Sequence, residues 1–225
     1  MRITGHRGAA DLAPENTIAA FETAIGHGVD AVEFDVRATA DDELVVIHDD
    51  SVDRTTDGTG RVDSLPLSEL RALDAGDGQS VPTLAEVLDF LADEDVGLRI
   101  ELKERGVGGR VIEAVTERGL EARTTITSFD FEALEEVAGG PVRVGVIAPE
   151  PTDEVLEVVD RLGAAALFVS VDAVDADAVE AAASRAIELG VWTVNDEAGV
   201  DRAVSVGVDS ITTDRPDMVG RRLRR

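Results

Sequence analysis

Cysteine is absent from the 225 residues, so the chain has no disulfide framework, no thiolate chemistry and no cysteine zinc site. Aromatic residues make up only 3%. No apolar run reaches the roughly 18 residues of a membrane-spanning helix, which argues against an integral membrane segment. The N-terminus leads straight into a polar stretch without the apolar region of a signal peptide. We therefore expect a cytoplasmic protein.

Positive charge is also scarce. Asp and Glu number 47 against 21 Lys and Arg, a formal net charge of −26, and the single lysine is Lys103. Such self-repulsion destabilises a compact chain at low ionic strength, and about 1 M salt, with a Debye length of roughly 3 Å, screens most of it. The composition favours a halophilic protein from a salt-rich cytoplasm; an acidic mesophilic protein is the alternative.

The lack of a basic stripe argues against nucleic acid as a partner, because a polyanion needs one. The one basic group is the tail Arg221, Arg222, Arg224 and Arg225. We interpret it as the last turn of a helix, with cations near the negative end of the helix dipole; contact with anionic lipid is the alternative. The sequence predicts no particular oligomeric state.

Short β-branched runs alternate with Ala-, Glu- and Leu-rich stretches of helical period along the whole chain. The predicted strands cover residues 3–5, 31–36, 98–102, 125–127, 142–147, 166–170, 191–195 and 210–213. The predicted helices cover residues 17–25, 84–92, 109–118, 131–137, 152–162, 176–189, 197–206 and a short piece after residue 216. Eight such units predict an α/β fold, a (β/α)8 TIM barrel; a doubly wound open sheet is the alternative.

One segment, at about residues 49–82, interrupts this alternation of predicted strands and helices. It is rich in turn-forming Gly, Asp and Thr, with a short amphipathic piece at residues 67–73. Inserted after the second strand, it would lie on the C-terminal rim of a barrel, where functional sites form. We expect a single domain, residues 1–225, that carries this segment as a small cap insertion. A plain surface loop is the alternative.

Acidic residues inside apolar strands indicate a candidate site. Glu33 and Asp35 are two apart in one predicted strand, so both carboxylates face the same way. Glu101 and Lys103 share a face of the next long strand. If the two strands are neighbours, the three carboxylates converge, and such oxygen ligands suit one divalent cation, magnesium, calcium or manganese, rather than zinc. Acidic residues on a solvated face are the alternative.

Lys103 is notable because the chain uses arginine for almost every other cation. An ammonium differs from a guanidinium in size and hydration. We interpret Lys103 as a group that neutralises a substrate phosphate, with chance placement as the alternative.

The histidines number three. His27 lies between two glycines at a predicted helix end, where a capping role is expected. His6 and His48 each follow a strand-like run, and we interpret them as a general acid and a general base beside the metal. Next to His6, Arg7 is suited to bidentate contact with phosphate oxygens. A structural role for each histidine is the alternative.

A series of short motifs runs in order along the chain. They are His6-Arg-Gly, Pro14-Glu-Asn-Thr, Glu33-Phe-Asp, His48-Asp, Arg54-Thr-Thr, Gly58-Thr-Gly, Pro82-Thr-Leu, Glu101-Leu-Lys, Trp192-Thr-Val-Asn and Thr213-Asp-Arg-Pro. From residue 3 to about residue 219, this series resembles the glycerophosphodiester phosphodiesterase family.

The resemblance implies a (β/α)8 barrel with a small insertion after the second strand. It also implies metal-dependent hydrolysis of a small-molecule glycerophosphodiester to glycerol phosphate and an alcohol, a step in lipid and glycerol metabolism. By that resemblance, Glu33, Asp35 and Glu101 hold the divalent metal, and His6 and His48 are the catalytic pair.

The resemblance extends to the substrate. It implies that Arg7 and Lys103 contact the phosphate and that Glu15 supports the site from behind. Trp192 would lie at the pocket mouth; a core aromatic is its alternative. Two further functions stay open: a lysophospholipase D or a cyclic-phosphate-forming phosphodiesterase on the same scaffold, and a non-catalytic barrel that binds phosphodiesters.

Overall fold

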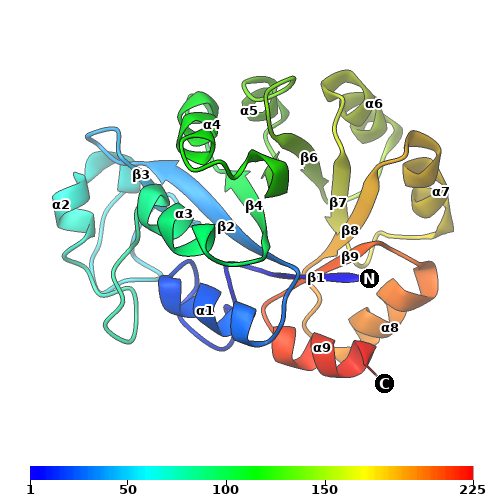
Figure 1. The fold of residues 1–225 in the computed structure, drawn as a ribbon, viewed down its shortest axis with the longest axis horizontal. Helices are drawn as coiled ribbons and strands as arrows, with labels where there is room; N and C mark the ends of the chain where they lie inside the picture. Colours follow the sequence, from blue (N-terminus) through cyan, green and yellow to red (C-terminus); the bar gives the residue numbers. More distant parts are fainter. Residues whose placement is uncertain (225) are drawn as a thin grey trace.

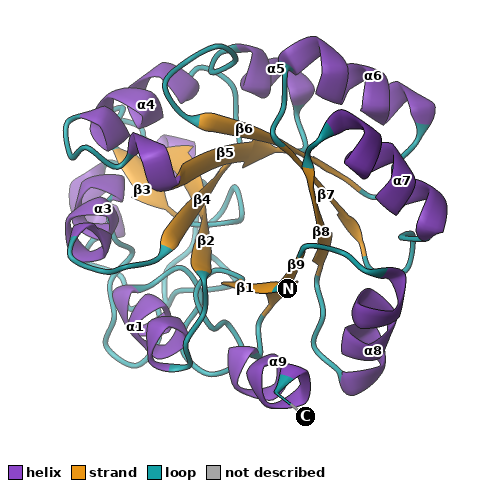
Figure 2. Cartoon of the chain, turned by 45° about the vertical axis from the view of Figure 1, so that its right-hand side comes forward, coloured by secondary structure: helices purple, strands orange, loops and turns teal. Residues whose placement is uncertain are grey.

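Eight parallel strands close into a ring in the computed structural model, which describes residues 1–224 (Figure 2). The strands are β1 (Arg2–Gly5), β2 (Ala31–Ala38), β4 (Gly97–Leu102), β5 (Thr124–Ser128), β6 (Arg143–Ala148), β7 (Ala166–Ser170), β8 (Glu188–Trp192) and β9 (Ser210–Thr213). The ring closes because β1 pairs with both β9 and β2. The fold is therefore the expected (β/α)8 barrel, and the open sheet is excluded.

Helices surround the ring on its outside (Figures 1 and 2). They are α1 (Ile18–Gly26), α3 (Leu84–Ala92), α4 (Gly108–Thr116), α5 (Phe131–Glu135), α6 (Asp153–Leu162), α7 (Ala176–Arg185), α8 (Glu197–Val206) and α9 (Pro216–Leu223), with a 3-10 turn, η2 (Glu121–Arg123). Of the basic tail, Arg221 and Arg222 lie in the last turn of α9 as expected and Arg224 is its C-cap, while Arg225 lies outside the described residues.

The hydrophobic core lies between the strands and the helices. Along β2, Val32, Phe34 and Val36 are fully buried against this layer. The alternate residues Glu33 and Asp35 therefore face the interior of the barrel, because successive side chains of a strand point to opposite faces. Apolar packing outside the ring leaves its interior free for polar groups.

Side chains cap the starts of α1 and α5. Thr17 accepts a hydrogen bond from Ala20 N at the start of α1, and Asp130 accepts one from Glu132 N at the start of α5. His27 occupies the position that closes α1, so its predicted place at a helix end is confirmed.

The segment after β2 has a small buried cluster of its own. It contains β3 (Leu44–Val46), antiparallel to β2 and missed by the sequence prediction, a 3-10 turn, η1 (Val62–Ser64), and α2 (Leu67–Leu70). Val52, Val62 and Leu70 are buried at 1% exposure or less in this cluster. The amphipathic piece predicted at residues 67–73 is thus α2, with its apolar side facing this cluster.

The boundary between α7 and β8 was predicted wrongly. The sequence favours a helix to residue 189 and a strand at 191–195, but α7 ends at Arg185 and β8 spans Glu188–Trp192. Ala186 takes a left-handed conformation, φ 53°, and closes the helix. Gly190 lies inside β8, where a Cβ would stand 2.5 Å from the Phe168 ring. Barrel packing has overridden the helical propensity of Glu and Leu.

Within residues 1–224, no helix combines the length and the apolarity needed to span a membrane.

Candidate active site

Three buried carboxylates lie together at the C-terminal half of the barrel. Strands β2 and β4 are neighbours, as the sequence argument required, and Asp35 stands opposite Glu101 in their register. With Glu33, they bring one carboxylate oxygen each to within 4.8 Å of the others. Their exposures are 2% for Glu33, 1% for Asp35 and 7% for Glu101. The predicted cluster therefore exists.

One oxygen of this cluster lacks a partner. Arg7 N donates to Glu33 Oε2 at 2.8 Å, and Asn16 Nδ2 donates to Asp35 Oδ2 at 2.8 Å. Glu33 Oε1 is buried and accepts no hydrogen bond from any residue in the 1–224 range, whereas the buried Asp35 Oδ1 has Lys103 Nζ at 3.2 Å. A buried acceptor without a partner is costly, and oxygens of this kind are what hard divalent cations bind. The donor set fits a metal ion.

Two cations border the carboxylates. Lys103 Nζ lies 2.5 Å from Glu101 Oε1 and 3.2 Å from Asp35 Oδ1. Arg7 Nε lies 3.4 Å from Asp35 Oδ2, and its Nη1 donates to Glu15 Oε1 at 2.8 Å. Glu15 thus stands behind Arg7, and both cations also line the cavity described below.

A tight turn after β1 aims Arg7 at the cluster. Arg7 and Gly8 have consecutive positive φ angles of 49° and 85°. This conformation is strained for arginine, and it directs the Arg7 backbone N–H at Glu33. Gly8 admits no larger residue, because a Cβ there would stand 2.5 Å from the Ala20 carbonyl carbon.

Each predicted catalytic histidine is held by a carboxylate. His6 Nδ1 lies 2.7 Å from Asp214 Oδ1, and Asn195 Nδ2 donates to the other oxygen of Asp214 at 2.5 Å. His48 Nδ1 lies 2.6 Å from Asp49 Oδ1. In both pairs the carboxylate orients the ring through Nδ1, so that Nε2 is left for the cavity.

Arg54, from the segment after β3, joins these groups. Its guanidinium donates to Asp49 Oδ2 at 2.6 Å and to Glu15 Oε2 at 2.7 Å. Because Glu15 also accepts from Arg7, the orienting partner of His48 is connected to the cation beside the carboxylates.

The two histidines have opposite pKa shifts. Burial alone would lower the pKa of His6, but the hydrogen bond to Asp214 and the charge of Glu33 outweigh it, and the pKa is raised. For His48, burial lowers the pKa, and the attraction of Asp35 and Asp49 does not restore it, because Lys103 and Arg7 add repulsion. Opposite shifts of this kind favour different protonation states at neutral pH.

The carboxylates also differ from one another. Burial, reinforced by the charge of Asp35, raises the pKa of Glu101 to about 7. Burial acts on Asp35 in the same sense, but Lys103 and Arg7 outweigh it and hold the pKa of Asp35 below its usual value. The ionised form of Asp35 is therefore the one that its surroundings favour.

A cavity of about 180 Å³ connects these groups. Its polar wall includes both histidines, Arg7, Glu33, Glu101 and Lys103, and its apolar wall consists of Phe129, Ile147, Phe168 and Trp192. Trp192 ends β8, donates from Nε1 to Phe168 O at 3.1 Å and meets Phe129 edge to face at 5.4 Å between centroids. The predicted site residues thus come together around one cavity, with Asp35 beneath it and Glu15 behind Arg7.

Sequence reasoning gave no role to Asp214, Asp49, Arg54 or Arg99. Asp49 follows His48 directly, and Asp214 and Arg54 occur in the quoted motifs. These positions were therefore available as candidate partners that orient the histidines. Arg99 precedes Glu101 by two residues, and the strand period places it on the same inward face.

This chain is similar to proteins of one known family. The model of the Glycerophosphoryl diester phosphodiesterase family matches residues 6–218. A glycerophosphodiester phosphodiesterase of Caldanaerobacter subterraneus is 35% identical over 229 residues, covering 96% of this chain and 94% of its own length.

Solved structures agree with this match. A phosphodiesterase of Oleispira antarctica, in complex with the product sn-glycerol-3-phosphate, aligns with a TM-score of 0.91 at 29% identity, over 100% of this chain and 97% of its own. A glycerophosphodiester phosphodiesterase of Agrobacterium tumefaciens aligns with a TM-score of 0.86 at 32% identity, over 98% and 99%.

Proposed function

The chain belongs to the glycerophosphoryl diester phosphodiesterase family, a family of phosphoric diester hydrolases, and we propose that it hydrolyses a glycerophosphodiester to glycerol phosphate and an alcohol. The observation that carries this proposal is the meeting of two oriented histidines and three buried carboxylates around one cavity. The product complex of the Oleispira relative supports the substrate class.

We propose that Glu33, Asp35 and Glu101 hold one divalent cation, Mg²⁺, Ca²⁺ or Mn²⁺. The unpartnered, buried Glu33 Oε1 and the convergence of three carboxylates support a hard ion. When bound, such an ion supplies positive charge that stabilises the charge developing on the phosphoryl group.

In our proposal Arg7 and Lys103 bind the phosphate. Both line the cavity while their other contacts hold them against Glu15, Asp35 and Glu101. Donors fixed in this way stabilise developing negative charge without reorganising during the reaction. Glu15 keeps Arg7 in place, and Trp192 forms the wall at the mouth that contacts the departing alcohol or the glycerol.

The opposite pKa shifts support an assignment that the sequence left open. His6, with its raised pKa, is protonated and gives a proton to the leaving alkoxide. His48, with its lowered pKa, is neutral and takes the proton of the attacking hydroxyl. That hydroxyl belongs either to water or to the glycerol next to the phosphate, which would form a cyclic phosphate.

A lysophospholipase D activity is the second candidate. Phe129 is 44% exposed and stands beside Trp192, so apolar surface continues outward from the cavity. Such a surface suits an acyl chain. A panel with glycerophosphocholine and lysophosphatidylcholine separates the two activities.

We further propose that residues 1–225 form a single domain in which the segment at about 49–82 is a cap over the site. The bridge from Arg54 to Asp49 and Glu15 supports this arrangement. The net charge of −26 supports a halophilic protein that works in a salt-rich cytoplasm.

The decisive experiment is the substrate panel with chelated enzyme in high salt, followed by return of Mg²⁺, Ca²⁺ or Mn²⁺. We expect turnover of a glycerophosphodiester only after metal is returned. Metal-independent turnover contradicts the metal proposal, and binding without turnover points to the non-catalytic barrel. A brief single turnover in oxygen-18 water separates the two routes, because an unlabelled cyclic phosphate should be detectable before labelled glycerol phosphate only if the glycerol hydroxyl attacks.

A further inference from the structure

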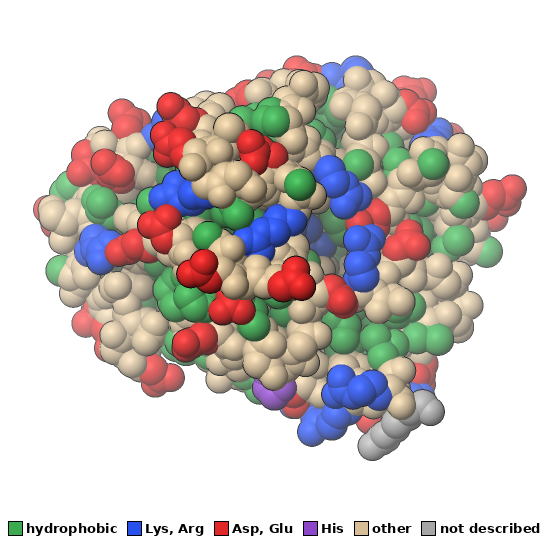
Figure 3. All heavy atoms as spheres, in the orientation of Figure 1, with side chains coloured by type: hydrophobic (Ala, Val, Ile, Leu, Met, Phe, Trp, Pro, Cys, Tyr) green, Lys and Arg blue, Asp and Glu red, His purple; other side chains and the backbone are tan. Residues whose placement is uncertain are grey.

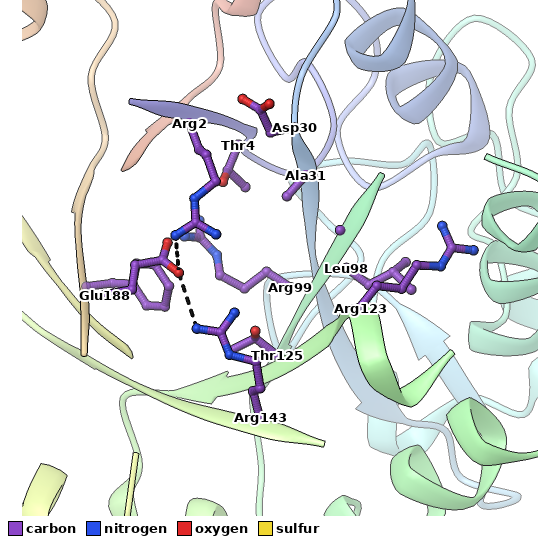
Figure 4. Close-up of a pocket in the computed structure, with 12 residues that line it drawn as sticks. Arg2, Thr4, Asp30, Ala31, Leu98, Arg99, Arg123, Thr125, Arg143 and Glu188 are labelled. Atoms are coloured by element: carbon purple, nitrogen blue, oxygen red, sulfur yellow. Dashed lines mark hydrogen bonds and ion pairs between the residues drawn. The ribbon is translucent and has the colours of Figure 1, made fainter. Parts of the chain in front are cut away.

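A second cavity, of about 90 Å³, opens at the opposite, N-terminal end of the barrel (Figure 4). It is surrounded by residues near the starts of the strands, among them Arg2 of β1, Arg143 of β6 and Glu188 of β8. In Figure 3, blue cationic side chains gather near the middle of the face, close to where Figure 1 marks the N-terminus, while red acidic ones are spread over it. A cationic hollow is unusual in a chain with a net charge of −26.

Arg99 forms the inner end of this cavity. It is 6% exposed and lies on the inward face of β4, two residues before Glu101. Its Nη2 donates to Thr212 Oγ1 at 2.6 Å, and its guanidinium stands 4.4 Å from the centre of the Phe168 ring. Arg99 and Phe168 line both cavities, so they separate this one from the catalytic one.

Two nitrogens of Arg99 have no acceptor. Nε and Nη1 are buried and make no hydrogen bond within the described part of the chain. Buried charged donors are normally paired, because leaving them unsatisfied is costly. The charges of Glu33 and Glu188 attract this guanidinium, but two of its donors have no acceptor in contact.

The two carboxylates that line this cavity do not accept from these nitrogens. Glu188 already accepts from Arg2 at 2.6 Å, from Ser210 at 2.8 Å and from Arg143 at 3.5 Å (Figure 4). Asp30 accepts from Ile3 N at 2.7 Å. The lining holds four arginines (Arg2, Arg99, Arg123, Arg143) against these two carboxylates, so positive charge is in excess.

We propose that the N-terminal mouth of the barrel binds one small inorganic anion between Arg99 inside and Arg2 and Arg143 at the rim. The hydroxyl-bearing Thr4 and Thr125 also line the cavity and can donate to the ion. The cavity has half the volume of the catalytic one, which suits a halide or a tetrahedral oxyanion rather than an organic phosphate. This site goes beyond the proposed hydrolysis and does not depend on it.

Diffraction tests the site directly. Crystals of the full chain grown with sodium bromide should show an anomalous peak within hydrogen-bond distance of Arg99 Nε or Nη1, and crystals grown with sulfate distinguish an oxyanion from a halide. Density for either ion at Arg99 supports the proposal. Absence of both from the mouth, or an Arg99 guanidinium paired with a carboxylate, overturns it.

Thermal unfolding gives an independent test. At fixed ionic strength, replacing gluconate, which is too large to enter, by chloride should raise the wild-type Tm by roughly 2–8 °C, because an ion that binds only the folded state stabilises it. Arg143→Gln should reduce this difference by at least about half, and Arg99→Gln should abolish it.

Arg161→Gln is the matched control, since Arg161 is an exposed arginine of α6 that pairs with Glu135 and does not line the cavity. It should keep the full chloride effect. If Arg99→Gln does not fold, the proposal is still tested by comparing the chloride effect on Tm in the wild type with that in Arg143→Gln and Arg161→Gln. An equal Tm in both salts, or an unchanged difference in Arg143→Gln, overturns the proposal.

Discussion

Asp214 Oδ1 lies 2.7 Å from His6 Nδ1, although the two residues are 208 positions apart. The contact exists because β9 pairs with β1, with Thr213 opposite Gly5. Closure of the barrel thus places the carboxylate after the last strand against the histidine after the first, and raises the pKa of that histidine.

Asp214→Asn should lower kcat by at least about tenfold and move the alkaline limb of its pH profile to lower pH. The carboxylate raises the pKa of His6, so its loss lowers that pKa, and His6 loses its catalytic proton at a lower pH. Asp217→Asn is the control, because Asp217 pairs with Arg215 and lies outside the cavity. An alkaline limb that stays in place in Asp214→Asn would refute the assignment of His6 as the acid.

Asp49→Asn should shift the acidic limb of the pH profile of kcat. The hydrogen bond that His48 donates to Asp49 raises the pKa of His48 against the effect of burial, so its removal lowers that pKa further. His48 acts in its neutral form, and the acidic limb of kcat should therefore move to lower pH, with a reduced plateau. Asp50→Asn makes the same charge change at an exposed carboxylate paired with Arg61 and should leave the limb unchanged. A shift of the alkaline limb instead would mean that the histidine roles are reversed.

Glu101→Gln should weaken Mn²⁺ binding by at least about tenfold, measured by calorimetry, and lower turnover in parallel. The reason is that one of three converging carboxylate oxygens is lost. In the wild type, chelation should remove activity and lower Tm, since a bound cation stabilises only the folded state. Glu104→Gln, two residues after the end of β4 and outside the cluster, is the control. Equal Mn²⁺ affinity in both variants would exclude Glu101 as a ligand.

Lys103→Met should lower kcat/KM by about 100-fold, because a donor held against Asp35 and Glu101 is lost from the phosphate side of the cavity. Lys103→Arg should not restore full activity, since the planar guanidinium is larger than the ammonium and bonds in a different geometry. Arg105→Gln changes the same charge at an exposed site and should retain activity. Full activity of Lys103→Arg would show that charge alone matters there.

Activity and Tm should both rise with salt. The local cations must act against a net charge of −26, and about 1 M salt shortens the Debye length to roughly 3 Å. Sucrose at equal osmolality, which does not screen charge, should fail to reproduce the rise in activity. An activity maximum below about 0.1 M salt would contradict this prediction.

Much of the site geometry could be predicted from the sequence, because every second side chain of a strand points to the same face. Glu33 with Asp35, and Glu101 with Lys103, were predicted to share faces, and the structure places them so. The same rule applied to residue 99 would have indicated Arg99. The catalytic and binding roles of these residues remain predictions until the variants are measured.

Local sequence determined the alternation of strands and helices, the caps at Thr17 and Asp130, and the inward faces of β2 and β4, because each depends on neighbours along the chain. Only the tertiary structure decided that the sheet closes, that β8 begins at Glu188, and that Asp214 meets His6. These features depend on contacts between residues far apart in the chain, which no local pattern encodes.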